Sequence, residues 1–287
     1  MPRIAHLPER STVAVTGADA EKLLQGIITG DMERLRREPA IHAALLSPQG
    51  KILFEFMVVA IEAGFKLETS RARAADLVKR LGLYKLRAAV QIVDRSAEED
   101  VYATWGDGGG GIDGAYVDPR LVGLGWHFTR PSASPLLDAE PAAAYHAHRI
   151  ALGVPEAELD YALGDAFPHE ACFDVLGGVA FDKGCFIGQE VVSRMQHRGT
   201  ARKRFVQVSG SGPLPAPGTE ITAGPASIGS MGSSAGEQGL ALVRLDRAVE
   251  AMEAGTPIEA GGVPLSLSVP AWASYKLSGA QVEAGHG

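Results

Sequence analysis

The sequence feature that most constrains the fold is a series of short apolar segments that begins near residue 204. Each segment is followed within a few residues by Gly, Pro or Ser. Short strands separated by turns in this way are typical of a small antiparallel barrel or sandwich. The predicted strands lie at residues 204–210, 219–223, 226–232, 238–246 and 265–270.

The N-terminal part of the chain mixes strand and helix patterns instead. A hairpin is indicated by two alternating segments that meet at Ala63 and Gly64, and Gly30 is a suitable stop for the first helix. The resulting order is an α+β pattern close to a ferredoxin-like unit. Strands are predicted at residues 10–16, 51–62, 64–70, 87–96 and 99–105, and helices at 17–31 and 71–86.

A further helix is predicted between residues 138 and 152. Asp138 is a suitable N-cap residue, and Gly153 and Pro155 follow the last residues of the helical pattern. Before this helix, two short strands are expected on either side of the turn at Asp118. The middle of the chain therefore connects the α+β part to the strand-rich C-terminal part.

Length, charge and cysteine count limit the class of protein. A chain of 287 residues is long enough for two or three compact units. Its formal net charge of -7 disfavours a general polyanion-binding surface. Two cysteines can form neither a disulfide scaffold nor a four-thiolate metal site. The N-terminal segment has no apolar region of signal-peptide length, and no membrane-spanning run occurs. We therefore expect a cytoplasmic protein.

The segment FDKGCFIGQEVVSRMQHRG, residues 181–199, carries the strongest candidate for chemistry. Cys185 precedes a stretch that can form a helix, and a thiol at a helix N-terminus feels the positive end of the dipole. Lys183 and Arg194 could strengthen that field. The alternative interpretation is a small apolar side chain in a tight turn. Cys172 has apolar neighbours and is expected to be a buried structural thiol.

Charged residues around this segment allow several interpretations. Glu190 and Arg194 have the spacing of a helical salt bridge, and Glu170 is the other nearby carboxylate. A Cys–His nucleophilic pair or a metal site with His169 or His197 lacks a known spacing. The basic residues 194–204 form either a solvated face or a site for a phosphate, a nucleic-acid backbone or a carboxylate tail.

The stretch KGCFIGQEVVSR resembles the signature K-G-C-[FY]-x-G-Q-E-x-x-[AS]-R of the YgfZ family, folate-binding relatives of the glycine-cleavage T-protein. The segments RSTVAVTGADAEKLLQGIITGD, LLSPQGKILFEF and LYKLRAAVQIVD resemble other family motifs in the same order. The resemblance implies an aminomethyltransferase-like α+β fold with a ferredoxin-like middle module and a C-terminal antiparallel β-barrel. The implied domains are residues 1–47 plus 112–203 for folate binding, 48–111 for the ferredoxin-like module and 204–287 for the barrel.

The resemblance also implies a function. Family members bind tetrahydrofolate or a one-carbon derivative, without a covalent bond, and act in the assembly or repair of iron–sulfur clusters. The implied partners are iron–sulfur client proteins or the assembly machinery. No membrane partner is expected, and nucleic acid is disfavoured. Carried to this chain, the functional thiol is Cys185, and no metal ligands of its own are expected. Its motif neighbours are Lys183, Gln189 and Glu190, and the expected folate contacts are Arg194, Arg198, Glu170 and Gln25.

One departure from the family pattern bears on the reaction. Aminomethyltransferases carry an acidic residue in R-x-E-A-G that binds the pterin, and Ala151 occupies that position here. Alanine cannot form the bidentate pair that a carboxylate makes with pterin N–H groups. We therefore expect a maturation or repair factor rather than a folate-dependent aminomethyl or one-carbon transferase. An RNA-binding or RNA-modification accessory role for residues 194–204 is the other alternative, and the net charge disfavours it.

Overall fold

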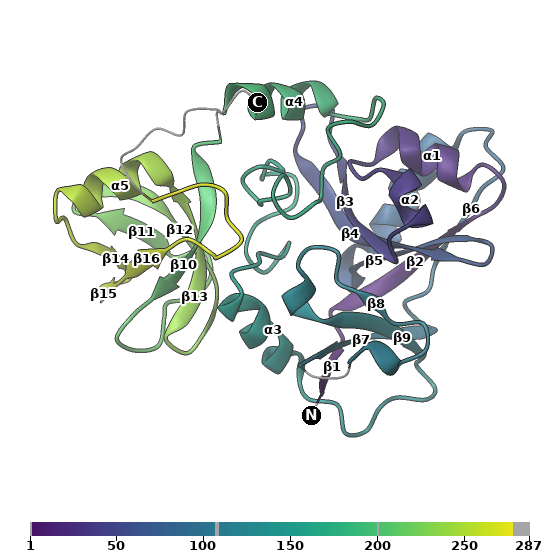
Figure 1. The fold of residues 1–287 in the computed structure, drawn as a ribbon, viewed down its shortest axis with the longest axis horizontal. Coiled ribbons are helices and arrows are strands. Elements are labelled where there is room, and N and C mark those ends of the chain that lie inside the picture. Colours follow the sequence, from purple (N-terminus) through teal and green to yellow (C-terminus); the bar gives the residue numbers. More distant parts are fainter. Residues whose placement is uncertain (1, 107–108, 200, 278–287) are drawn as a thin grey trace.

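The structure is a computed structural model that describes residues 2–106, 109–199 and 201–277. The described residues form three β-sheets, of five, four and seven strands. Figure 1 shows the seven-stranded sheet at the left, the other two sheets at the right, and helix α4 (Gln189–Arg198) above the space between them. Among the described residues, none of the helices is long and apolar enough to cross a membrane.

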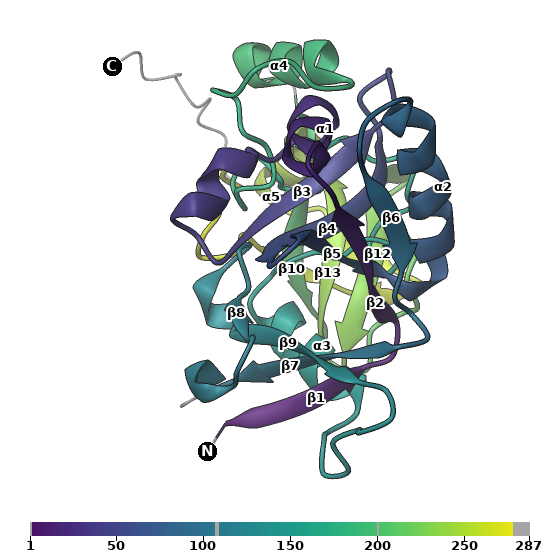
Figure 2. The same cartoon turned by 90° about the vertical axis from the view of Figure 1, so that its right-hand side faces the viewer.

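The five-stranded sheet has the order β3-β4-β5-β2-β6, and all its pairs are antiparallel. Helix α2 packs on β2 and β6, while α1 contacts β5 (Figure 2). Buried aliphatic and aromatic side chains, including Leu24, Phe56 and Leu77, form the core between sheet and helices. The elements are β2 (Arg10–Thr16), α1 (Ala20–Ile27), β3 (Ala40–Leu46), β4 (Ile52–Ile61), β5 (Gly64–Ser70), α2 (Ala74–Lys85) and β6 (Gln91–Asp94).

The local patterns of this part predicted its elements except strand β3. The hairpin turns at Ala63 and Gly64 as expected. Gly64 has a φ of 152°, and a Cβ there would lie 2.4 Å from the carbonyl oxygen of Val15, so only glycine lets the turn approach β2 this closely. Helix α1 ends at Ile27, earlier than the predicted stop at Gly30.

The four-stranded sheet has the order β1-β7-β9-β8 and is covered by α3, which also contacts the barrel strands β12 and β13. The prediction that Asp138 caps this helix is wrong, because the helix begins at Ala142 with Pro141 at the N-cap. A residue before proline avoids helical geometry, so the helix cannot run through Glu140. The elements are β1 (Arg3–Leu7), β7 (Glu99–Trp105), β8 (Tyr116–Val117), β9 (Trp126–Pro131) and α3 (Ala142–Ala151).

The seven-stranded antiparallel sheet has the order β15-β14-β11-β12-β13-β10-β16 and encloses its own apolar core. Helix α5 (Leu245–Glu253) was not predicted, because the strand predicted at residues 238–246 includes its first two residues. Its buried residues are Ala248 and Ala251. The strands are β10 (Lys203–Ser209), β11 (Glu220–Ala223), β12 (Ala226–Ala235), β13 (Gln238–Arg244), β14 (Ile258–Ala260), β15 (Val263–Pro264) and β16 (Ser266–Ser268).

Short 3₁₀ turns complete the described secondary structure. They are η1 (Met32–Arg36), η2 (Arg71–Arg73), η3 (Gly109–Gly111) and η4 (Val122–Leu124). The division into domains 1–47 plus 112–203, 48–111 and 204–287 stays a prediction. Strands β2 and β3, from the first of these ranges, share one sheet with β4, β5 and β6.

A buried ion network joins the three sheets. Arg10 of β2 contacts Glu68 of β5 at 3.0 Å and Glu156 at 3.4 Å. Arg149 of α3 contacts Asp160 at 2.7 Å and donates to the hydroxyl of Ser233 on β12 at 2.8 Å. Buried charges are tolerated only when they are paired. The buried ion network consists of Arg10, Glu68, Asp118, Arg120, His127, Arg149, Glu156 and Asp160.

Replacement of Arg149 by methionine tests how much the buried ion network contributes to the stability of the protein. Arg149→Met leaves Asp160 and Glu156 buried without a common cation, so we expect the free energy of unfolding to fall by about 3–5 kcal/mol. The measurement is urea unfolding followed by circular dichroism. The matched control is Arg3→Met, which removes an exposed pair with Glu140 and should leave the midpoint nearly unchanged. Equal effects of the two substitutions would contradict the prediction.

Candidate functional site

The cysteine motif forms a turn that packs against the loop after β3. Gly188 is the N-cap of α4 with a φ of 79°, and a Cβ there would lie 2.6 Å from the carbonyl oxygen of Ser47. Glycine is therefore required both for the left-handed conformation and for the close approach. On the other side of this contact Gly50, with a φ of 80°, faces Val191 of α4. The motif turn, residues 181–188, is thus held against the five-stranded sheet.

Lys183 anchors the motif turn to the end of helix α1. Its Nζ donates to the carbonyl oxygens of Ile28 at 2.9 Å and Gly30 at 2.7 Å. These carbonyls lie at the C-terminal end of α1, where the helix dipole favours a cation. Burial lowers the pKa of Lys183 to about 8, against the charge of Asp31, which raises it. Lys183 therefore holds the motif turn against the end of α1.

The two cysteines occupy opposite environments. Cys185 is exposed, whereas Cys172 is buried, with its sulfur 3.4 Å from the hydroxyl of Tyr275. Burial raises the pKa of the Cys172 thiol. The prediction that Cys185 lies at the N-terminus of a helix is wrong, since α4 begins four residues later, at Gln189. Phe186 and Ile187, which follow Cys185, pack against the hydrophobic cores, and the helix begins only after them.

The other predicted site residues do not converge on one point. Glu190 and Arg194 form an exposed i,i+4 ion pair at 2.7 Å, and Arg198 is exposed in the last turn of the same helix. Gln25 donates to Asp31 at 2.8 Å, so its amide supports the loop that receives Lys183. Gln189 is the first residue of α4, and Glu170 accepts from the backbone N–H of Phe167 at 2.9 Å.

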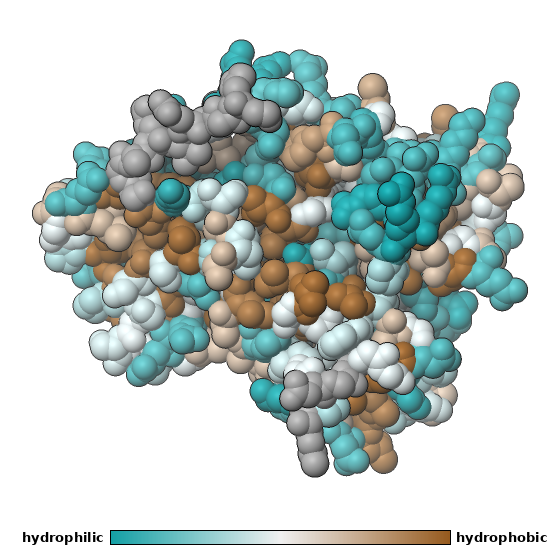
Figure 3. Space-filling model, viewed as in Figure 1, coloured by the Kyte–Doolittle hydropathy of each residue, from teal (hydrophilic) through white to brown (hydrophobic). Residues whose placement is uncertain are grey.

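Three cavities share wall residues, the first against the N-terminal sheets and the other two against the barrel. Cavity 1, of about 510 Å³, shares the wall residues Glu158 and Leu159 with cavity 2, of about 460 Å³. Cavity 2 shares Glu170 and Lys203 with cavity 4, of about 250 Å³. Figure 3 shows apolar residues gathered in the middle of this face, between the barrel and the other sheets. Cavities of this size and position are typical of small-molecule sites.

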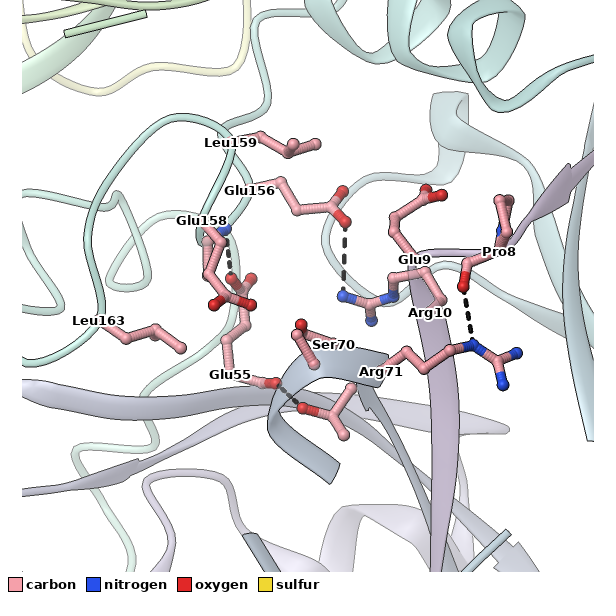
Figure 4. A pocket seen from close by; sticks show the side chains of 13 residues that line it. Pro8, Glu9, Arg10, Glu55, Ser70, Arg71, Glu156, Glu158, Leu159 and Leu163 are labelled. Carbon is pink, nitrogen blue, oxygen red and sulfur yellow. Dashed lines mark hydrogen bonds and ion pairs between the residues drawn. The ribbon is translucent and has the colours of Figure 1, made fainter. Parts of the chain in front are cut away.

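The wall of cavity 1 carries four carboxylates and two arginines (Figure 4). Glu55 accepts from the hydroxyl of Tyr161 at 2.6 Å and the N–H of Ala157 at 2.9 Å, and lies 2.9 Å from Nε2 of His42. Burial alone would raise the pKa of Glu55, but His42 and the charge of Arg120 hold it below its usual value. The charged wall residues are Glu9, Arg10, Glu55, Arg71, Glu156 and Glu158.

Glu158, in the wall of cavity 1, has a left-handed backbone conformation. Its φ is 67°, in the left-handed region that costs a residue with a side chain on the order of 1 kcal/mol or more and that occurs often at functional sites. Its Oε1 accepts from Nε of Arg73 at 2.7 Å. Ala151, by contrast, is exposed at the end of α3, and its carbonyl accepts from Gln207 at 2.9 Å. A carboxylate at the cavity is therefore supplied by the loop after α3.

Sequence reasoning missed the buried ion network and most of cavity 1. One signal was present, since Glu55 interrupts the apolar strand ILFEFMVV, and a charged residue inside such a strand needs a buried partner. The partners themselves come from segments far apart in the chain. Arg120, for example, forms an ion pair with its neighbour Asp118 at 2.7 Å. It also contacts Glu156, from the loop after α3, at 3.4 Å.

Comparison with known proteins supports the fold. Residues 202–275 match the family model described as the CAF17 C-terminal beta-barrel domain. The glycine cleavage system aminomethyltransferase T from Bartonella henselae superposes with a TM-score of 0.75 at 17% identity, covering 94% of this chain and 86% of that chain. The predicted α+β, aminomethyltransferase-like fold with a C-terminal antiparallel β-barrel is therefore confirmed.

The relatives found by sequence are named iron-sulfur cluster assembly factor IBA57, mitochondrial, or its homologs. The Chaetomium globosum protein is 30% identical over 328 residues, covering 90% of this chain and 74% of its own length. The human protein is 29% identical, with 93% of this chain and 84% of its own length covered. The Neurospora crassa protein is 31% identical over 71% of this chain, which spans only 52% of that relative.

The expectation of a cytoplasmic protein is wrong in view of these relatives. Their names place them in mitochondria and point to the mitochondrion rather than the cytoplasm. The expectation came from the lack of a secretory apolar region and of membrane spans. Those features do not report on mitochondrial import, for which the targeting segments are amphipathic rather than apolar.

The pH dependence of stability tests the charges beside cavity 1. Burial by itself would raise the pKa of Glu68, but His127 and Arg10 lower it to about 2. Because this is below the unfolded value of 4.5, the stabilisation by Glu68 is complete above pH 4.5 and is lost as the pH falls toward 2. We expect Glu68→Gln to destabilise the protein by about 3–5 kcal/mol at pH 7.

The difference in free energy of unfolding between Glu68→Gln and the unmodified protein should become smaller as the pH falls from 4.5 to 2. Urea unfolding of both at pH 7, 4.5 and 3 measures it. The control is Glu98→Gln, at an exposed pair with Arg95, which should follow the unmodified protein at each pH. A Glu68→Gln difference that stayed constant with pH would show that Glu68 is not ionised in this network.

Proposed function

Because this chain belongs to the family of the iron–sulfur cluster assembly factor IBA57, we propose that it binds a reduced folate and acts in the assembly or repair of iron–sulfur clusters. The partners would be iron–sulfur client proteins or components of the assembly machinery. The functional thiol would be that of Cys185. The likeness of residues 183–194 to the YgfZ signature supports the folate and the thiol together.

The observation that carries the proposal is the presentation of Cys185. The residue is exposed, while Lys183 on one side is hydrogen-bonded to two carbonyls and Phe186 on the other side is buried. A thiol held on a fixed turn and open to solvent is accessible to a macromolecular partner. Cys172, by contrast, is buried and is not accessible to a partner.

An iron–sulfur cluster would be a substrate that Cys185 contacts. Clusters are held by several thiolates, and this chain has two cysteines, of which Cys172 is buried. The remaining ligands would therefore come from the client or from a cluster carrier. Gln189 and Glu190, which begin α4 directly after the motif turn, are proposed to position the turn toward that partner.

Cavity 1 fits the pterin end of a folate in size and in chemistry. Its volume of about 510 Å³ is within the range of small-molecule sites. A pterin presents an amino group and a ring N–H on one edge, and a carboxylate is the matching acceptor. The hydrogen bond of Glu158 to Arg73 uses Oε1. We assign its other oxygen the acceptor role that Ala151 cannot fill.

The rest of the folate would extend from cavity 1 into cavity 2. Leu159, in the wall shared by both, offers apolar surface to the aromatic linker. Glu170 borders cavity 2, and Arg194 and Arg198 of α4 are proposed contacts of the anionic tail. Gln25 would act indirectly, through the loop that receives Lys183. A bound reduced folate supplies a reduced ring that can carry a one-carbon unit.

Substitution of Cys185 tests the proposed thiol. In cells that lack the endogenous protein, we expect Cys185→Ser to restore less than about a tenth of iron–sulfur enzyme activity under oxidative stress, because serine cannot supply a thiolate. Folate affinity of the purified variant should be unchanged. The matched control, His197→Ala, alters an exposed residue of α4 and should restore activity fully. Full activity of Cys185→Ser would exclude a role for the thiol.

Substitution of Glu158 tests the folate site separately. Glu158→Gln keeps the shape but removes the charge, so we expect binding of 5-formyltetrahydrofolate to weaken about tenfold. Isothermal titration calorimetry measures the affinity. Glu98→Gln, which changes an exposed carboxylate away from the cavity walls, is the control. Unchanged affinity of Glu158→Gln would place the pterin elsewhere, and no binding by the unmodified protein would reject the folate role.

A further inference from the structure

We propose that the C-terminal end of helix α2, residues 79–87, is a docking surface for a protein that offers an apolar pocket rimmed by carboxylates. The inference goes beyond the proposed function, because it involves neither the cavities proposed for folate nor Cys185. Residues 83–94 resemble one of the YgfZ-family motifs, yet none of them lines cavity 1, 2 or 4. Helix α2 lies at the right-hand edge of the molecule in Figure 2.

Two leucines at the end of α2 are exposed to solvent. The helix buries Ala74, Leu77 and Leu81 against the core. Leu83, by contrast, is 68% exposed, and Leu86, the C-cap residue, is 86% exposed. Leucines scattered singly over a surface need no explanation, but two that lie three residues apart contribute to one apolar patch. Such a patch is the kind of surface that marks an interaction site.

Leu86 also has a backbone conformation that favours glycine. Its φ is 47° and its ψ is -110°, and the N–H of Ala88 donates to the carbonyl oxygen of Lys85 at 2.8 Å. This is the geometry of the first central residue of a type II′ turn, a position that glycine dominates. A leucine there strains the folded chain, and its side chain gains no burial in return. The side chain of Leu86 therefore serves a contact outside this chain.

Gly82 is a further residue of this turn that does not favour the isolated helix. Glycine inside a helix is less stable than alanine, and a Cβ at Gly82 would meet nothing within 4 Å. Alanine would therefore fit here, whereas glycine leaves room for a partner one turn before Leu86. Departures from local rules that gather in one place are expected at functional sites. Gly82, Leu83 and Leu86 are such a group.

Cations surround the two leucines and define the chemistry of the partner. Two of them precede Leu83 by four and three residues, on the same face of the helix, and two flank Leu86 in the chain. Within the described chain only Lys79 is in an ion pair, at 3.2 Å from Asp76. Because the whole chain has a net charge of -7, this positive charge is local, and the complementary surface is acidic. The four cations are Lys79, Arg80, Lys85 and Arg87.

A protein fits this surface better than an anionic membrane does. The net charge of -7 opposes the approach of the chain to an anionic lipid surface. A helix that lies in a membrane interface needs an apolar side along its length, and that side of α2 packs into the core. Tyr84, between the two leucines, is half-buried. A pocket that receives Leu86, with carboxylates at its rim, matches both the apolar and the charged parts of the surface.

Photo-crosslinking in cells that lack the endogenous protein tests the surface, with Leu83 replaced by the apolar photoprobe p-benzoylphenylalanine. We expect discrete protein adducts whose cross-linked peptides are rich in Asp and Glu. Leu86→Gly removes the apolar contact and Arg87→Glu reverses a charge, so each should lower the adduct yield about fivefold. The matched control is Leu137→Gly, which removes a leucine that is 90% exposed in the loop before α3 and should leave the yield unchanged.

Urea unfolding of the same variants separates docking from folding. Leu86→Gly should raise the urea midpoint, because glycine adopts a φ of 47° without strain. A loss of adducts in this variant would then not come from unfolding. Leu137→Gly changes a residue that has no positive φ, and its midpoint should not rise.

Four results would overturn the proposal. They are an absence of discrete adducts, an unchanged yield in Leu86→Gly or Arg87→Glu, cross-linked peptides that lack acidic residues, and a lower midpoint of Leu86→Gly. Flotation of the protein with vesicles of phosphatidylcholine and cardiolipin, at a ratio of about four to one, would assign the surface to a membrane if it depended on Leu86. Folate binding and the Cys185→Ser variant are measured independently, so the proposed function is tested separately.

Discussion

The carboxylate of Asp160 is the contact on which the arrangement of the three sheets depends. It accepts from Arg149 of α3 at 2.7 Å, from the N–H of Glu156 at 2.8 Å, and from the N–H and hydroxyl of Ser233 on β12 at 2.7 and 2.6 Å. A buried charge with four donors has little freedom to move, because loss of any partner leaves it unpaired in a medium of low dielectric. The loop after α3 is thereby fixed between the barrel and the four-stranded sheet.

This loop determines the shape of the cavities on both of its sides. Glu158 and Leu159 belong to cavities 1 and 2 alike, and Glu156 extends the ion network into the wall of cavity 1. With Arg10, Arg120 and Arg149 against Glu68, Asp118, Glu156 and Asp160, the network has one more carboxylate than arginine. His127, whose pKa these acids raise although burial lowers it, supplies the fourth cation. The charges of the buried ion network are thereby balanced, four cations against four carboxylates.

Local patterns predicted most of the elements and indicated one candidate site residue. The β4–β5 hairpin, helix α2 and the short strands of the barrel follow from periodicity and turn residues, and Cys185 was identified from its motif. The start of α3, helix α5 and the distance of Cys185 from α4 were not predicted. In each of these cases the competing effect was local, namely a proline at residue 141, a strand pattern that continues into residues 245–246, or packing of residues 186–187 before the helix.

The sequence by itself determined the class of fold, the cysteine motif and the likeness to folate-binding proteins, because these depend on residues that are close in the chain. Only the tertiary structure decided which charges meet. Arg10 and Glu68 are 58 residues apart, and Arg10 and Glu156 are 146 apart. Pairing at such separations depends on how the sheets pack, and packing is a property of the whole core. The carboxylate that we propose as a ligand contact, Glu158, therefore lies in the loop after α3 and not at the position of Ala151.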